Sequence, residues 1–207
     1  MEKHFVSNKD ESARIFKNDI FEFLSKVHWT VPLIVYIPII GYLMYRSIEI
    51  FEVNWFENLI LFPTGLFVWS FVEYILHRFV FHYHPKAGWA KKLHWTFHGV
   101  HHDYPQDSKR LVMPPAVSIP LAILFFAIFS FIFGPALVNP FFAGFLLGYL
   151  FYDILHYAIH HFAFKAKWLH ALKSHHMKHH YIEPDEGFGV SSPLWDLMFG
   201  TTFSSKK

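Results

Sequence analysis

Histidine is the residue type in this sequence that most directly suggests chemistry. The chain of 207 residues contains 17 histidines and no cysteine. Imidazole nitrogen is the commonest metal ligand in proteins, whereas thiolate zinc sites and iron–sulfur clusters require cysteine. Four short clusters contain ten of the histidines, and these ten are the predicted metal ligands: His77, His82, His98, His101, His102, His156, His160, His176, His179 and His180.

The spacing within each cluster indicates how the imidazoles can converge. Residues three and four positions apart share one face of a helix, so each HxxHH cluster is expected to present its three imidazoles toward one point. His156 and His160 are expected to hold one ion from a single helix. The five-residue step from His77 to His82 does not fit one helical face. Either the helix ends near Arg78, or these two histidines serve different ions.

The number of clustered histidines favours two metal ions with about five imidazoles each. A closed structural zinc site takes four ligands. Nitrogen-rich sites with higher coordination and an exchangeable position suit a redox-active iron pair that activates dioxygen. Zinc can occupy the same ligands in purified protein, because such sites bind zinc more tightly than ferrous iron. The alternative is a solvated, histidine-rich loop that holds metal loosely.

Four apolar stretches are available to position these clusters. They cover residues 29–45, 59–76, 117–133 and 137–155, and each approaches the ~20 residues that cross a bilayer as a helix. The composition, 53% hydrophobic and 16% charged, also favours a membrane protein over the alternative of a soluble all-α protein. Only Gly134-Pro135-Ala136 separates the last two stretches, which predicts a tight turn. The expected fold is all-α, with four transmembrane helices in two hairpins and one domain over residues 1–207.

The distribution of basic residues predicts the orientation in the membrane. Of the 18 lysines and arginines, five precede the first stretch, one lies between the first and second, and six lie between the second and third. None lies between the third and fourth, and six follow the fourth. The positive-inside rule therefore places both termini in the cytosol. Residues 78–115 and 156–207 are expected to form a cytosolic cap that holds the metal ions.

Other features of the sequence restrict the possible partners. The first 28 residues lack the continuous apolar core of a secretory signal, so they are expected to remain in the mature protein. A net charge of +2 without a basic stripe argues against nucleic acid as a partner. A membrane metal transporter is a further alternative, but transporters place ligands near the bilayer midplane, whereas these clusters lie at the ends of the apolar stretches.

The histidine clusters and the residues around them resemble the membrane fatty acid hydroxylase superfamily, which also includes sterol desaturases. The fatty acid 2-hydroxylase branch is the most similar. The matching segments cover most of residues 70–200: Leu76-His77-Arg78-Phe79, Phe97-His98-Gly99-Val100-His101-His102, Tyr152-Asp153-Ile154-Leu155-His156, His175-His176-Met177-Lys178-His179-His180, Gly187-Phe188-Gly189-Val190-Ser191 and Leu194-Trp195-Asp196.

The resemblance implies a di-iron centre that hydroxylates a fatty acyl chain at carbon 2, using dioxygen and two electrons. The ten histidines fall on the metal-binding pattern of the superfamily. Tyr152 and Asp153 match positions that line or support the site, and a carboxylate three residues before His156 could orient that imidazole. A sterol or carotenoid hydroxylase or desaturase of the same superfamily is the alternative activity.

Larger relatives carry a cytochrome b5 domain with a His-Pro-Gly-Gly motif. The only His-Pro of this chain, His84-Pro85, continues with Lys86-Ala87. Electrons are therefore expected from a separate donor, such as a cytochrome b5 or ferredoxin system. The expected location is the plasma membrane in a bacterium and the endoplasmic reticulum in a eukaryote. Of the remaining histidines, His94, His161 and His175 are not expected to be ligands, although they could support neighbouring ligands. His84 and His170 are expected to pack at interfaces, and His4 and His28 to lie away from the site.

Overall fold

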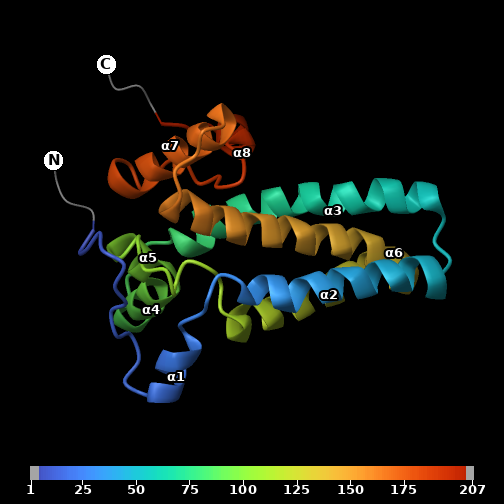
Figure 1. Cartoon of the computed structure of the whole chain (residues 1–207), viewed down its shortest axis with the longest axis horizontal. Coiled ribbons are helices and arrows are strands. Elements are labelled where there is room, and N and C mark those ends of the chain that lie inside the picture. The colour runs from blue at the N-terminus through green and yellow to red at the C-terminus, as the bar shows by residue number, and fades with distance from the viewer. Residues whose placement is uncertain (1–4, 204–207) are drawn as a thin grey trace.

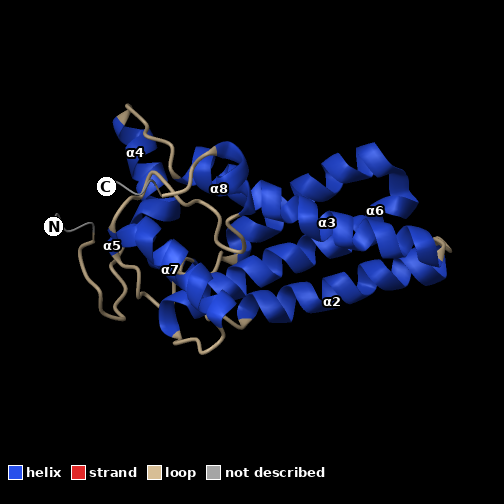
Figure 2. Ribbon diagram, turned by 90° about the horizontal axis from the view of Figure 1, so that it is seen from above, coloured by secondary structure: helices blue, strands red, loops and turns tan. Residues whose placement is uncertain are grey.

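The structure, a computed structural model, describes residues 5–203, and the regular elements among them are all helical (Figures 1 and 2). Three helical segments are long and apolar enough to cross a membrane. They are α2 (Val31–Tyr45) with the π-helical turn η1 (Arg46–Ile50), α3 (Trp55–Ile75) with the π-helical turn η2 (Leu76–Phe81), and α6 (Pro115–His161). The shorter elements are α1 (Asp19–Leu24), α4 (Gly88–His94), η3 (Trp95–Gly99), α5 (Val100–Asp103), α7 (Lys167–Tyr181) and α8 (Leu194–Phe199).

The long helix α6 reverses its direction at Gly134. This glycine has φ 76° and ψ 174°, a conformation that a residue without Cβ adopts readily. Phe126 and Phe142, sixteen residues apart, have ring centroids separated by 5.2 Å, although sixteen residues of straight helix span about 24 Å. The two halves of α6 therefore pack against each other as an antiparallel hairpin, in agreement with the turn predicted at Gly134-Pro135-Ala136.

Close backbone contact joins α3 to the second half of α6. A Cβ added to Gly65 would lie 1.9 Å from the carbonyl oxygen of Phe141, and one added to Gly144 would lie 1.8 Å from that of Phe62. Small residues at such positions let two helices approach closely. The contact aligns the helix that leads into His77 with the helix that carries His156 and His160.

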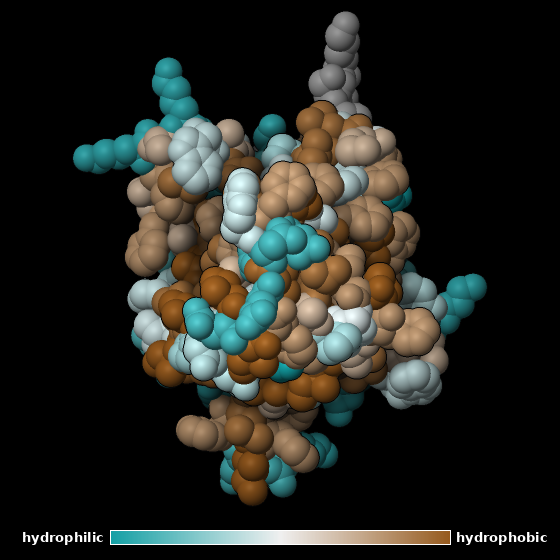
Figure 3. All heavy atoms as spheres, turned by 90° about the vertical axis from the view of Figure 1, so that its right-hand side faces the viewer, coloured by the Kyte–Doolittle hydropathy of each residue, from teal (hydrophilic) through white to brown (hydrophobic). Residues whose placement is uncertain are grey.

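The histidine-bearing elements gather at one end of the helical bundle. Figure 1 shows α4, α5, α7 and α8 together at this end, while the connection between α2 and α3 lies at the opposite end. Figure 3 looks onto that opposite end, where a few hydrophilic groups interrupt a largely hydrophobic surface. The exposed Glu52 and Asn54 belong to the connection there. The chain thus separates an apolar bundle from a histidine-rich cap.

Candidate metal centre

The structure assembles the ten clustered histidines into two groups of five. Within each group, the candidate ligand nitrogens all lie within 4.8 Å of one another. Group one consists of His77, His82, His98, His102 and His179. Group two consists of His101, His156, His160, His176 and His180.

Each HxxHH cluster divides its histidines between the two groups, which corrects the expectation that all three would meet at one point. On and beside α5, His98 and His102 belong to group one and His101 to group two. On α7, His176 and His180 belong to group two and His179 to group one. Residues four apart stay nearly in line along a helix. The other histidine of each cluster directly precedes the second member of this pair, and successive residues point about 100° apart around the helix axis. Both elements therefore run between the two groups and contribute to each.

The step from His77 to His82 is accommodated by the π-helical turn η2. The amide of His82 donates a hydrogen bond of 3.0 Å to the carbonyl of His77, an i to i+5 pattern. This wider turn brings both imidazoles to group one. The α-helix ends at Ile75, close to the end predicted near Arg78, but the π-helical turn continues the helical path to Phe81. The alternative, that the two histidines serve different ions, is wrong, because both belong to group one.

The spacing of the Nε2 atoms fits a cation of high coordination number. In group one, His98 Nε2 lies 3.2 Å from His77 Nε2 and 3.1 Å from His82 Nε2. In group two, His176 Nε2 lies 3.1 Å from His160 Nε2 and from His180 Nε2. Ligands at about 2.1 Å from an ion are about 3.0 Å apart at right angles and about 3.4 Å apart in a tetrahedron. The separations lie between these two values, and those of 3.1 Å are nearer to the right-angled arrangement of five- and six-coordinate ions.

Burial prepares these imidazoles to act as neutral ligands. Desolvation lowers the pKa of His102 to about 3, with further lowering by neighbouring histidines. It also lowers the pKa of His98, His101 and His179 well below the ordinary value. Nε2 of both His101 and His156 is buried without a hydrogen-bond partner. Neutral imidazoles with unused lone pairs are what a bound metal ion requires.

Tyr152 and Asp153 lie beside group two, on the second half of α6. Asp153 is 1% exposed and accepts hydrogen bonds from the amide of Met113, at 3.0 Å, and the hydroxyl of Tyr149, at 3.1 Å. Both predicted residues line a cavity of about 910 Å³. The expected hydrogen bond from an imidazole to Asp153 is not among these contacts, so this carboxylate holds the backbone beside the cavity instead.

A cavity of about 910 Å³ leads to both groups. Its walls are mainly apolar and come from α1, η2, α4, η3 and the start of α6. Its lining includes His98 of group one and His101 and His156 of group two. Its volume lies in the range of ordinary ligand pockets, and its position lets one bound molecule reach both groups.

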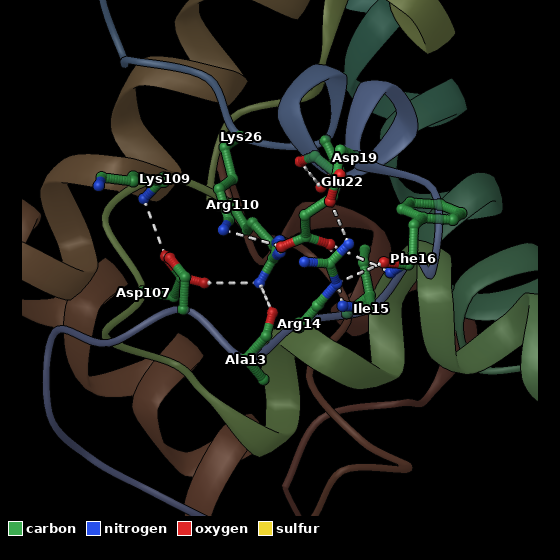
Figure 4. A network of polar contacts seen from close by, with 12 residues as sticks. Ala13, Arg14, Ile15, Phe16, Asp19, Glu22, Lys26, Asp107, Lys109 and Arg110 are labelled. Carbon is green, nitrogen blue, oxygen red and sulfur yellow. Dashed lines mark hydrogen bonds and ion pairs between the residues drawn. The ribbon is translucent and has the colours of Figure 1, made fainter.

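The N-terminal segment forms one wall of this cavity, a role that the sequence did not indicate. Ile15, Phe16 and Phe21 line the cavity. A network around Arg110 holds the segment in place (Figure 4): this arginine bonds Glu22 at 2.6 Å, and Glu22 also accepts the amides of Ile15 and Phe16. The segment is thereby attached to the connection between α5 and α6.

The remaining histidines have separate surroundings. His94 donates a hydrogen bond to the carbonyl of Phe81, next to a group-one ligand, and His175 pairs with Asp196 at 3.2 Å. His161 is half-buried beside Tyr157. Exposed positions are occupied by three others, His28, His84 and His170. His4 lies outside the described residues.

Comparison with known proteins adds a decisive observation to this geometry. The family model described as "Fatty acid hydroxylase" matches residues 62–201. The chain is also 38% identical over 197 residues to dihydroceramide fatty acyl 2-hydroxylase FAH1 of Arabidopsis thaliana, an alignment that covers 95% of this chain and 82% of the relative. The chain belongs to the fatty acid hydroxylase family.

Other relatives of this fatty acid hydroxylase include the fatty acid 2-hydroxylase of Homo sapiens. That protein is 36% identical over 213 residues, covering 93% of this chain and 57% of the human one. A solved structure titled "Full length scs7p (only hydroxylase domain visible)" superposes with a TM-score of 0.86 at 35% identity, covering 93% of this chain and 72% of that chain. Membership confirms the family and the enzyme class predicted from the motifs, an oxidoreductase that hydroxylates lipids.

The buried carboxylate of Glu73 is a feature of the site that sequence reasoning missed. It lies on α3, four residues before His77, and is 3% exposed. A carboxylate inside an otherwise apolar stretch was the signal that could have identified it, because such groups are retained only with specific partners.

Proposed function

We propose that this fatty acid hydroxylase introduces a hydroxyl group at carbon 2 of a fatty acyl chain, as a free fatty acid or as the acyl group of a ceramide-type sphingolipid. The names of its relatives support this assignment, since FAH1 is called a dihydroceramide fatty acyl 2-hydroxylase and the human relative a fatty acid 2-hydroxylase. The single structural observation that carries the proposal is the mainly apolar cavity that is lined by histidines of both groups.

The ten histidines are proposed to hold two metal ions, with iron as the active metal. When bound, such a pair supplies the dioxygen activation that breaks an unactivated C–H bond. One oxygen atom enters the product as the hydroxyl group, and the other leaves as water after two electrons and two protons are supplied. The electrons come from a separate donor, of the cytochrome b5 or ferredoxin type.

The protein's own residues position the lipid and exclude water. The apolar walls from α1, α4 and α6 hold the acyl chain, and Tyr152 lies where the cavity meets group two. Asp153 holds the backbone of Met113, another residue of the wall. Fixing one methylene next to the centre and excluding water are what selective oxidation of one carbon requires.

The proposed membrane arrangement has four crossings. α2 and α3 provide two, and the two halves of α6 on either side of Gly134 provide two more. The metal centre and both termini then face the cytosol, consistent with the basic residues of the cap. In this arrangement the cavity opens beside the ends of the spans, where a lipid can enter with its acyl chain still shielded from water.

The test is mass spectrometry of total lipids from a host that lacks 2-hydroxy fatty acids, with and without this chain. A His101→Ala variant is the matched control, because His101 is a group-two ligand that also lines the cavity. New 2-hydroxyacyl species that disappear in the variant would support the proposal. Modified sterols or carotenoids in place of hydroxyacyl lipids, in a host supplied with an electron donor, would overturn it.

A further inference from the structure

A short loop at residues 186–191 accepts hydrogen bonds from two histidines of group one. Nδ1 of His77 donates to the carbonyl of Phe188 at 2.5 Å, and Nδ1 of His179 donates to the carbonyl of Glu186 at 2.8 Å. A carbonyl can only accept, so Nδ1 carries the proton and Nε2 of a neutral ring is left with its lone pair. The loop thereby sets the tautomer and the direction of two candidate ligands.

Two buried carboxylates hold this loop by four successive backbone amides. The amides of Phe188 and Gly189 each donate to Asp196 at 2.8 Å. Those of Val190 and Ser191 donate to Glu73 at 2.8 and 2.9 Å, and the Ser191 hydroxyl donates to the other oxygen of Glu73. The hydrogen bonds to Asp196, whose pKa is held low, are charge-assisted and stronger than neutral ones. Each residue from 188 to 191 donates its amide to one of the two carboxylates.

The two carboxylates also connect the loop to the helices that carry the ligands. Glu73 is one helical turn before His77 on α3, so the helix supplies a ligand and the anchor for its acceptor. Asp196 is 0% exposed, and it pairs with His175, the neighbour of His176 on α7, at 3.2 Å. Burial alone would raise the pKa of Asp196, but hydrogen bonds from His175, Thr201 and the loop amides hold this pKa below its ordinary value.

We propose that Glu73 and Asp196 are positioning residues that orient His77 and His179 through the 186–191 loop, and so determine metal binding at group one. The proposal rests on the metal centre proposed above. It is specific to group one, because no hydrogen bond joins a group-two histidine to this loop in the described part of the chain. Neither carboxylate belongs to a histidine group or lines the cavity, and their proposed effect passes through backbone carbonyls.

The experiment measures zinc per chain and the cobalt(II) visible spectrum of the purified full-length protein in detergent. Wild type is expected to hold two ions, and His77→Ala supplies the spectrum of protein that has lost the group-one ion. Glu73→Leu removes the acceptors of three hydrogen bonds and is expected to hold one ion with the His77→Ala spectrum. Glu73→Gln is expected to restore two ions, since its oxygen can accept both amides while its amide nitrogen donates to Ser191.

A second variant tests the loop without altering a polar group. A Cβ at Gly189 would lie 2.1 Å from the carbonyl oxygen of Ser192 and 2.9 Å from Asp196 Oδ2, so Gly189→Ala must displace the loop. This variant is expected to lose the same ion even if Glu73→Leu fails to fold. Glu22→Leu is the matched control, because Glu22 also holds two successive backbone amides but contacts neither group, and it should keep both ions.

The outcomes separate this proposal from the one on which it rests. Wild-type protein without two bound ions would overturn the metal centre itself. Two ions and an unchanged spectrum in folded Glu73→Leu and Gly189→Ala would overturn the positioning role alone. Equal loss of both ions in these two variants would also overturn it, because a merely structural contribution would affect both groups.

Discussion

Group two is enclosed more completely than group one, although each contains five histidines. All five histidines of group two are buried, whereas His82 and His102 of group one are only half-buried. These two line a separate small cavity of about 180 Å³, together with His98 of group one and His180 of group two. Group one is oriented by hydrogen bonds from Nδ1 to a loop, whereas Nδ1 of His160, His176 and His180 in group two has no hydrogen-bond partner.

The difference indicates two ways of holding similar ligands. Group one depends on a hydrogen-bonded loop, and two of its rings are only half-buried. Group two depends on the packing of α6 against its neighbours, with two of its histidines on α6 itself. Changes to helix packing should therefore affect group two most, and changes to the loop should affect group one.

The largest loss of activity is expected on replacing His101 or His179, each of which belongs to a different group from the other two histidines of its HxxHH cluster. His101→Ala and His179→Ala should each reduce 2-hydroxylated product by at least about 100-fold, since even changes to groups that orient ligands cost about 10- to 100-fold. Each variant should keep one ion, in group one for His101→Ala and in group two for His179→Ala. Lipid mass spectrometry and zinc analysis measure these two quantities. Normal product from either variant would show that one group alone is sufficient.

A change in helix packing comes next. Gly65→Ala places a Cβ 1.9 Å from the Phe141 carbonyl oxygen and must separate α3 from α6. The expected cost is about 3 kcal/mol of unfolding free energy, measured by denaturation in detergent, with faster zinc release from group two. Gly41→Ala is the control, because its Cβ would have no neighbour within 4 Å. That variant should gain about 0.5–1 kcal/mol from its higher helix propensity. Equal stability of the two variants would contradict the packing argument.

A chelator should remove zinc from the two groups at different rates. Zinc-loaded protein treated with a chelator is expected to lose its ions in two phases, with the half-buried group one releasing first. A tenfold difference in rate, which corresponds to about 1.4 kcal/mol in barrier height, is the expected scale. The fast phase should be missing from His77→Ala. A single phase in the wild-type protein would mean that enclosure does not control release.

The smallest effect is expected at the Arg110–Glu22 pair, in the wall of the shared cavity. Burial raises the pKa of Glu22, but hydrogen bonds from Lys26, Phe16 and Ile15 and the charge of Arg110 outweigh this effect and lower the pKa to about 2. Because the pKa is lowered by folding, the ionised carboxylate stabilises the folded protein above the unfolded pKa of about 4.3, and this contribution is lost as the pH falls toward 2.

Glu22→Gln should accordingly destabilise the protein by about 1 kcal/mol at neutral pH, the difference between a charged and a neutral hydrogen bond. Thermal unfolding of the two proteins should differ by a constant amount above pH 5, and the difference should narrow below pH 4. The metal contribution is common to both proteins and cancels in the comparison. A difference that does not change with pH would mean that the charge of Glu22 is unimportant.

Local spacing was sufficient to predict which histidines come together, but not which of them belong to group one and which to group two. His156 and His160 could be paired from sequence because i and i+4 positions share a helix face. The placement of His101 and His179 depends on α5 and α7 lying between the groups, which is a tertiary property. The apolar stretches likewise predicted helices and the turn at Gly134, because length and composition determine both.

The supporting residues were harder to predict for a different reason. The bonds of Glu73 to Val190 and Ser191 join positions more than 110 residues apart in the chain. In the sequence, Asp196 is recognisable only as part of a segment that resembles the superfamily. The four donors to its carboxylate come from α7 and from the loops around α8. No local pattern reports such contacts, since a single carboxylate has no periodicity.

Because of the π-helical turn η2, the geometry of group one depends on the number of residues between His77 and His82. A wide turn between His77 and His82 contains one residue more than an α-helical turn, so it is equivalent to a single-residue insertion into the helix. Deleting any one residue from 78–81 would keep every histidine but would leave His77 and His82 four residues apart, so that an α-helical turn, and no longer the wide turn, would be needed to bring both imidazoles to group one. For this ligand, the count of intervening residues matters as much as their identity.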